Sequence, residues 1–138
     1  AAKPVRSYLD LIHDHVEKNN IHVVIWAPPA SPHLTDELLV EANRLWHEAD
    51  QLAAGDAALL RRVQISRMSV DYAIVERART AAATSGATAS PLHTLAVERF
   101  KPFTDMLGAS GLTNLHEWKR LDLADYRAKL GAALGVAP

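Results

Sequence analysis

The strongest constraint on the fold is a pair of helical patterns in residues 35–79, separated by one break at Gly55 and Asp56. In the first pattern, apolar residues recur at spacings of three and four, which places them on one stripe of a helix. The stripe consists of Leu38, Ala42, Leu45, Trp46, Ala49 and Leu52. Thr35 is suited to cap the start of this helix, and Gly55 is suited to the left-handed conformation that ends one.

The second pattern, in residues 56–79, is apolar on two sides. One row holds Leu59, Val63, Val70 and Ala73, and the other holds Ile65, Met68, Tyr72 and Val75. A helix with two apolar sides needs neighbours on both of them, so we expect this to be the most buried helix of the fold. Arg67 and Asp71 are four residues apart, and we expect them to form an exposed ion pair along the helix surface.

An amphipathic helix is predicted before this pair, from Pro4 to about Asn19, because apolar residues again recur at spacings of three and four. Residues 21–26 then form the only strand-like run in the chain. It is either an extended connection or a strand whose partner lies in a part of the protein outside this sequence. Prolines at positions 28, 29 and 32 exclude a helix and predict a stiff, extended crossing.

After residue 79, small side chains up to Ser90 predict that the helix loosens into a loop from Thr80 onward. Ser90 restarts a helix, which Pro102 is expected to kink or interrupt. Thr113 is suited to cap a short helix that carries Leu115 and Trp118, and Asp122 to cap the last helix. The sequence therefore predicts an all-α fold: one domain over residues 1–138, a bundle of five or six helices with one Pro-rich crossing.

Composition excludes several classes of partner. The formal charge is −1, so the chain has no basic field with which to hold nucleic acid or an anionic membrane. No apolar run reaches the roughly 20 residues that span a bilayer. The sequence begins without Met, and we expect a fragment from the C-terminal end of a longer protein. Its compartment stays open, secretion as part of that parent protein included.

Possible catalytic and metal-binding residues are few. His13, His15 and Glu17 lie close together in the sequence, but the two histidines point about 200° apart on a helix and cannot face one metal ion. No pair of acids can be selected as a glycosidic acid and nucleophile, and no phosphate-binding glycine loop is present. We therefore predict no catalytic residue, no metal site and no cofactor, and expect no enzymatic activity from this chain alone.

Trp26, His33 and Tyr8 are the candidates for a carbohydrate site or an interface. An aromatic ring on a rigid Pro-rich loop is suited to stack on the apolar face of a sugar. Trp26 equally fits a gap between the first two helices, and both interpretations stay open. If the segment containing residues 21–33 is an interface, the isolated chain is expected to associate, for example as a symmetric dimer.

Five short stretches carry a family resemblance. They are YLDLIH (8–13), LTDEL (34–38), LWHEA (45–49), LRRV (60–63) and ISR (65–67). Together they resemble the C-terminal helical region of large bacterial proteins of uncharacterised type that carry a domain similar to α-glucuronidases and other glycoside hydrolases. The resemblance covers about residues 5–79, includes no catalytic motif, and implies that a catalytic β/α-barrel precedes this chain.

The resemblance implies a non-catalytic accessory domain that packs against, or supports, the upstream catalytic barrel of a carbohydrate-active protein. Two other functions stay open. One is a free-standing helical module that binds a protein partner, and the other is a small metal-dependent enzyme.

Overall fold

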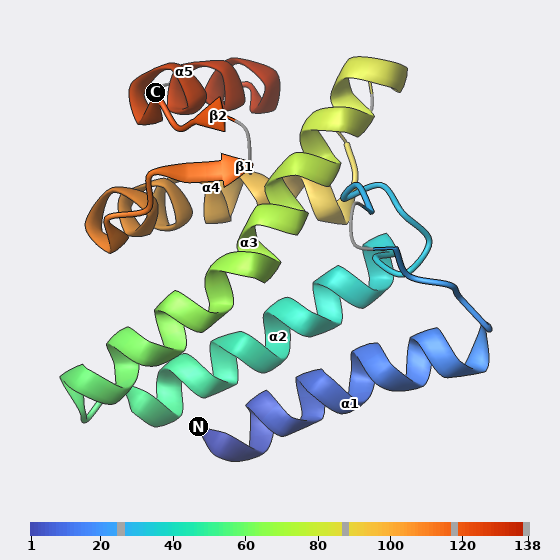
Figure 1. Ribbon diagram of the computed structural model, residues 1–138, viewed down its shortest axis with the longest axis vertical. Coiled ribbons are helices and arrows are strands. Elements are labelled where there is room, and N and C mark those ends of the chain that lie inside the picture. Colours follow the sequence, from blue (N-terminus) through green and yellow to red (C-terminus); the bar gives the residue numbers. More distant parts are fainter. Residues whose placement is uncertain (25–26, 87–88, 117–118, 137–138) are drawn as a thin grey trace. The chain divides into compact units, whose positions relative to one another are not determined.

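The computed structural model describes residues 1–24, 27–86, 89–116 and 119–136. Within these ranges lie five helices and one two-stranded hairpin (Figure 1). The helices are α1 (Ala2–Lys18), α2 (Asp36–Ala53), α3 (Ala57–Ser85), α4 (Pro91–Ser110) and α5 (Leu123–Leu134), and the strands are β1 (Asn114–His116) and β2 (Lys119–Arg120). The predicted all-α class with five or six helices is confirmed. No described helix is long and apolar enough to cross a membrane.

The chain divides into two compact units. The first contains residues 1–73 and the second residues 74–138. The boundary falls inside α3, so this helix contributes its first part to one unit and its last part to the other. That the whole chain forms one domain stays a prediction.

In the first unit, α1 and α2 lie side by side and run in opposite directions (Figure 1). The Thr35 side chain accepts a hydrogen bond from the backbone N–H of Leu38 at 3.2 Å, which confirms the predicted cap of α2. Asp36 and Glu37 occupy the first turn, where the helix dipole favours negative charge. Local sequence therefore specifies where α2 begins.

The turn between α2 and α3 differs from the prediction at Gly55. The φ angle of Gly55 is not positive, and the residue that ends α2, Ala54, is right-handed, with φ −58° and ψ −27°. The Asp56 side chain closes this turn by accepting from the N–H groups of Ala58 and Leu59, both at 2.9 Å. At the end of α2, Ala54 N–H donates to Gln51 O at 3.3 Å and Asp56 N–H donates to Ala53 O at 2.9 Å, so carbonyl groups there are satisfied without a left-handed residue.

Burial confirms most of the two predicted patterns. Leu38, Ala42, Leu45, Trp46, Ala49, Val63, Met68, Val70, Ala73 and Val75 are all buried. Leu52 and Ile65 are corrections, since they are 58% and 44% exposed. Leu39, which lies outside the predicted stripe, is only 1% exposed. Leu52 is the last member of its stripe, and a spacing of three and four residues drifts around a helix over several turns.

The described residues between α1 and α2, 19–24 and 27–35, contain no helix, as predicted, but residues 28–34 fold into turns where we expected an extended crossing. Ser31 N–H donates to Pro28 O at 2.9 Å, and Leu34 N–H donates to Ser31 O at 3.0 Å. Residues 21–24 form no strand. A side chain of α1 also holds the segment, because His15 Nε2 donates to the Pro32 carbonyl oxygen at 3.1 Å.

In the second unit, both helices that were expected to weaken are longer than predicted. α3 continues to Ser85, and the hydroxyl groups of Thr80 and Thr84 donate to backbone oxygens one turn earlier, at 2.8 and 2.9 Å. Ser90 caps α4, which runs through Pro102 without interruption. Pro102 is exposed, whereas its neighbours Phe103 and Thr104 are buried. Packing of the buried face therefore outweighs the lost backbone hydrogen bond.

The predicted short helix after Thr113 is wrong. Its place is taken by the antiparallel strands β1 and β2, in which Asn114 lies opposite Arg120. A bond from Leu121 N–H to Thr113 O at 2.6 Å lies next to this pair, outside the strands. Pairing between β1 and β2 satisfies backbone N–H and C=O groups that would have been satisfied by hydrogen bonds within a helix. Trp118 lies outside the described residues.

α5 begins as predicted, because the Asp122 side chain accepts from Asp125 N–H at 3.0 Å. Gly131 lets α5 approach α4 closely: a Cβ atom added there would lie 3.2 Å from Phe100 Cζ. The buried side chains Leu130, Leu134, Phe103 and Leu107 belong to the same two helices. These contacts form the apolar core of the second unit.

Candidate functional site

Of the three residues that the sequence suggested for a carbohydrate site or an interface, the structure describes two. Trp26 lies outside the described residues. The Tyr8 ring packs against Trp46 with 5.3 Å between centroids and a 56° tilt, and burial raises the pKa of Tyr8 above its ordinary value. His33 is half-buried, and its pKa is lowered by burial first and by nearby His15 second. Tyr8 is therefore a packing residue of α1, while His33 and His15 are brought close together.

One hollow in the first unit lies between the end of α1 and the start of α2. It is a groove of about 380 Å³. Its lining is supplied by Leu11, Asp14, His15, Lys18, Asn19, Thr35, Glu37, Leu38 and Glu41. The connecting segment starts directly after Asn19 and ends directly before Thr35, so the groove and this segment share one end of the unit.

Charges in the groove are partly matched. Lys18 Nζ lies 3.5 Å from an Asp14 carboxylate oxygen, and Arg44 donates two hydrogen bonds to Glu41 at 2.9 and 2.7 Å. The hydrogen bonds from Arg44 lower the pKa of Glu41. Glu41 is therefore ionised at neutral pH and is not suited to donate a proton as a general acid.

The part of the chain that the structure describes contains no group of three or more His, Asp or Glu side chains placed to hold a metal ion. His15 uses its two ring nitrogens locally, with Nε2 bound to Pro32 O and Nδ1 3.4 Å from the Asn19 amide nitrogen. The same-turn cluster of His13, His15 and Glu17 therefore offers no ready set of ligands.

The prediction that Arg67 and Asp71 form an exposed ion pair is wrong. Its side chain is 2% exposed, and Asp71 is 4% exposed. Arg67 donates to Asp71 at 3.2 Å and, across to α2, to Asp50 at 2.6 Å and to Asn43. These hydrogen bonds hold α3 on α2. Because the guanidinium is enclosed, it cannot contact a ligand from solution. The clue in the sequence was a pair of polar residues inside a doubly apolar helix.

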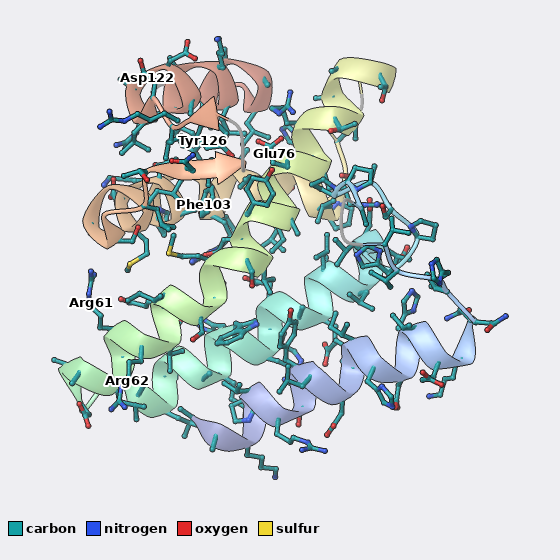
Figure 2. The ribbon with its side chains drawn as sticks, in the orientation of Figure 1. Arg61, Arg62, Glu76, Phe103, Asp122 and Tyr126 are labelled. Carbon is teal, nitrogen blue, oxygen red and sulfur yellow. The ribbon has the colours of Figure 1, made fainter. Side chains whose placement is uncertain are left out.

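A second buried carboxylate, Glu76, lies in the second unit, and sequence analysis missed it. Tyr126 Oη donates to Glu76 at 2.8 Å, and Arg79 donates to the other carboxylate oxygen at 2.9 and 2.7 Å. Figure 2 shows Tyr126 directed from α5 toward Glu76 on α3. The pair of Arg79 with Glu76 could be predicted from their spacing of three residues. The contact of Tyr126 with Glu76 joins residues 50 positions apart, so no local sequence pattern indicates it.

We expect Tyr126→Phe to lower the free energy of unfolding by about 1.5–3 kcal/mol, because it removes a hydrogen bond to a buried charged group. Urea denaturation followed by circular dichroism measures the change. Tyr8→Phe is the matched control, since no hydrogen bond of the Tyr8 hydroxyl is seen among the described residues. Equal effects of the two substitutions would contradict the assigned role of Tyr126.

Burial of Tyr8 predicts a loss of stability in alkaline solution. Its pKa is raised in the folded protein, so the unfolded chain gives up this proton first. The contribution is fully present below about pH 10, the ordinary value for Tyr, and is lost as pH rises through the folded pKa. The unfolding free energy of Tyr8→Phe should therefore fall less steeply above about pH 10 than that of the unchanged chain.

A smaller pocket of about 220 Å³ in the second unit lies beside the hairpin and α5. It is lined by Leu115, Arg120, Leu121, Asp122, Asp125, Tyr126 and Lys129. Its polar groups are largely engaged: Asp122 caps α5, Tyr126 binds Glu76, and Lys129 pairs with Asp125 at 2.8 Å. The polar residues that line this pocket therefore serve to cap α5 and to hold it in place.

No protein-family model, curated protein sequence or solved structure matches the chain. The resemblance to glycoside-hydrolase-like proteins therefore rests on the sequence stretches that carry it. Of the two hollows described above, the groove between α1 and α2 is the larger, and we take it, together with the segment that joins these helices, as the candidate site.

Proposed function

We propose that the chain is a non-catalytic helical docking domain, which presents the segment of residues 21–33 and the adjoining groove to another part of the same protein. The single observation that carries this proposal is the exposure of Val23 and Val24, which are 46% and 50% exposed. Two consecutive exposed β-branched residues leave apolar surface on the segment that joins α1 to α2, and exposed apolar surface supports a role in an assembly.

The geometry of the segment supports the proposal. Turns closed by backbone hydrogen bonds and the bond from His15 to Pro32 hold the segment on the end of α1. A surface fixed in this way loses little conformational entropy when a partner covers it. We propose that the chain is non-catalytic because two carboxylates of the groove, those of Asp14 and Glu41, already pair with basic residues.

The resemblance supplies the proposed partner: an upstream domain similar to glycoside hydrolases, beside which this chain acts as an accessory domain. The test is to produce that upstream domain separately and measure its binding to the chain by isothermal titration calorimetry. We expect binding that the double substitution Val23→Asp, Val24→Asp weakens by about tenfold or more, because it places charges in an apolar contact.

Leu112→Asp is the matched control, since Leu112 is 50% exposed but belongs to the second unit. It should leave the affinity unchanged. Absence of binding, or equal weakening by the control, would show that residues 21–33 are not a docking surface. Circular dichroism melting of each variant verifies that the helices stay folded.

A further inference from the structure

A histidine of α1 holds the segment that joins α1 to α2. His15 Nε2 donates to the Pro32 carbonyl oxygen at 3.1 Å, a bond between residues 17 positions apart in the chain. The next residue of the segment, His33, is half-buried, and His15 lies close enough to influence its charge. Two histidine rings therefore lie together where the segment meets the end of α1.

The surroundings of His15 fit its neutral form. The Asn19 amide nitrogen donates to the His15 backbone oxygen at 2.8 Å, which fixes the direction of the amide. The same nitrogen lies 3.4 Å from His15 Nδ1, so Nδ1 faces a donor and carries no proton. The ring proton is therefore on Nε2, from which it is donated to Pro32. A second proton, added at Nδ1, would meet the amide N–H of Asn19 and break this contact.

The surroundings of His33 also favour a neutral ring. Burial, and secondly the charge of nearby His15, lower the pKa of His33 below its ordinary value. The folded segment therefore resists a proton that His33 would take up in water. The resulting stabilisation of the segment is fully present above about pH 6.5, the ordinary value for His, and is lost as pH falls through the folded pKa.

Other charged groups near His15 oppose this effect only in part. Among the described residues that line the groove with His15, the charged ones are Asp14, Lys18, Glu37 and Glu41. Carboxylates would attract a cation on His15 and so offset its repulsion of His33. Two of the three already have a cation nearby, because Asp14 lies 3.5 Å from Lys18 and Glu41 lies 2.7 Å from Arg44. Repulsion between the two rings therefore persists when both are protonated.

We propose that His15 and His33 form a pH-sensitive switch, which holds residues 28–34 on the end of α1 at neutral pH and releases them in mildly acidic solution. When both rings are protonated, the two cations repel each other and His15 loses its contact with Asn19. His33 gains hydration by turning into water, which draws the neighbouring Pro32 away from His15. The switch needs no partner, so it goes beyond the docking role and is tested on the chain alone.

The test follows the mobility of the segment by electron paramagnetic resonance. The chain has no Cys, so Ala30→Cys places a single nitroxide label on an exposed residue of the segment. We expect the ratio of mobile to immobile label to rise about two- to fivefold from about pH 7.5 to about pH 5, the range for one interaction between partly exposed charges. An unchanged ratio would overturn the switch.

Ala124→Cys provides the control label, since Ala124 is exposed on α5 in the second unit. Its spectrum should not change between the two pH values. An equal change at this position would overturn the switch, because it would show a loosening of the whole chain. Circular dichroism at both pH values verifies that the helices stay folded.

Histidine variants assign the response to the two rings. The double variant His15→Gln, His33→Gln cannot titrate at these positions, so its label ratio should be the same at both pH values. His13→Gln is the matched control, since His13 is an exposed histidine of the same helix as His15, and it should keep the full response. A double variant that responds like the unchanged chain, or an equal loss of response in the control, would contradict the switch.

The single variant His33→Gln decides if the double variant is already mobile at neutral pH. It keeps the bond from His15 to Pro32 but removes the second charge. We expect a response smaller than that of the unchanged chain. A response of the same size would overturn the switch.

Discussion

Arg67→Ala is expected to lower the free energy of unfolding by about 3–5 kcal/mol, because it leaves buried carboxylates without their counter-ion. Arg67 pairs with both Asp50 and Asp71, at 2.6 and 3.2 Å. Both acids would then lie in a poorly solvated site, where an unpaired charge is unfavourable. Urea denaturation followed by circular dichroism measures the loss.

Arg62→Ala is the matched control for this prediction. Arg62 lies on the same helix but is exposed, and its guanidinium contacts a backbone oxygen of its own helix at 3.4 Å (Figure 2). Its substitution should change stability by less than about 0.5 kcal/mol. If the two variants melted alike, Arg67 would be an ordinary surface residue and the buried cluster would be wrong.

Leu39→Ala is expected to cost about 3 kcal/mol, within the range for a fully buried leucine replaced by a smaller side chain. Leu39 is 1% exposed, whereas Leu52 on the same helix is 58% exposed. Leu52→Ala should therefore change stability by less than about 0.5 kcal/mol. Leu39 lies on the buried face of α2 outside the predicted stripe, and Leu52 is the member of that stripe that is exposed. The two substitutions therefore test which side of α2 is buried.

The same denaturation experiment decides between the two faces. A larger loss for Leu52→Ala would mean that α2 is rotated about its axis relative to the structure. Equal losses would mean that α2 is covered on both sides, which its exposed residues contradict.

Helix starts could be predicted from the sequence because their signals are local. Thr35, Asp56, Ser90 and Asp122 each cap the helix that they were expected to cap. A cap depends on a side chain and on N–H groups two or three residues later, so its evidence is contained in one short stretch. The all-α class follows from the same local patterns.

Elements that depend on distant contacts could not be predicted. The strands β1 and β2 took the place of the expected helix, because pairing between strands competes with local hydrogen bonding. Arg67 was assigned to the surface because its partners Asp50 and Asn43 lie on another helix. The spacing to Asp71 was recognised correctly, but spacing alone does not distinguish a buried pair from an exposed one.

That residues 21–33 form an interface stays a prediction. The sequence directed attention to residues 21–33, and Val23 and Val24 are exposed there. The groove was not foreseen, since it needs the end of α1 and the start of α2 to lie together. Tyr8 was selected as a possible contact residue, but its ring packs on Trp46.

Hydrogen–deuterium exchange of the chain, alone and with the proposed upstream domain, tests the docking role most directly. Amides of a covered surface exchange more slowly in the complex, and the affected peptides locate that surface. We expect slower exchange in residues 19–24 and 27–35, which lie between α1 and α2, and unchanged exchange in residues 112–115 around Leu112. Protection around Leu112 with no change between residues 19 and 35 would contradict it.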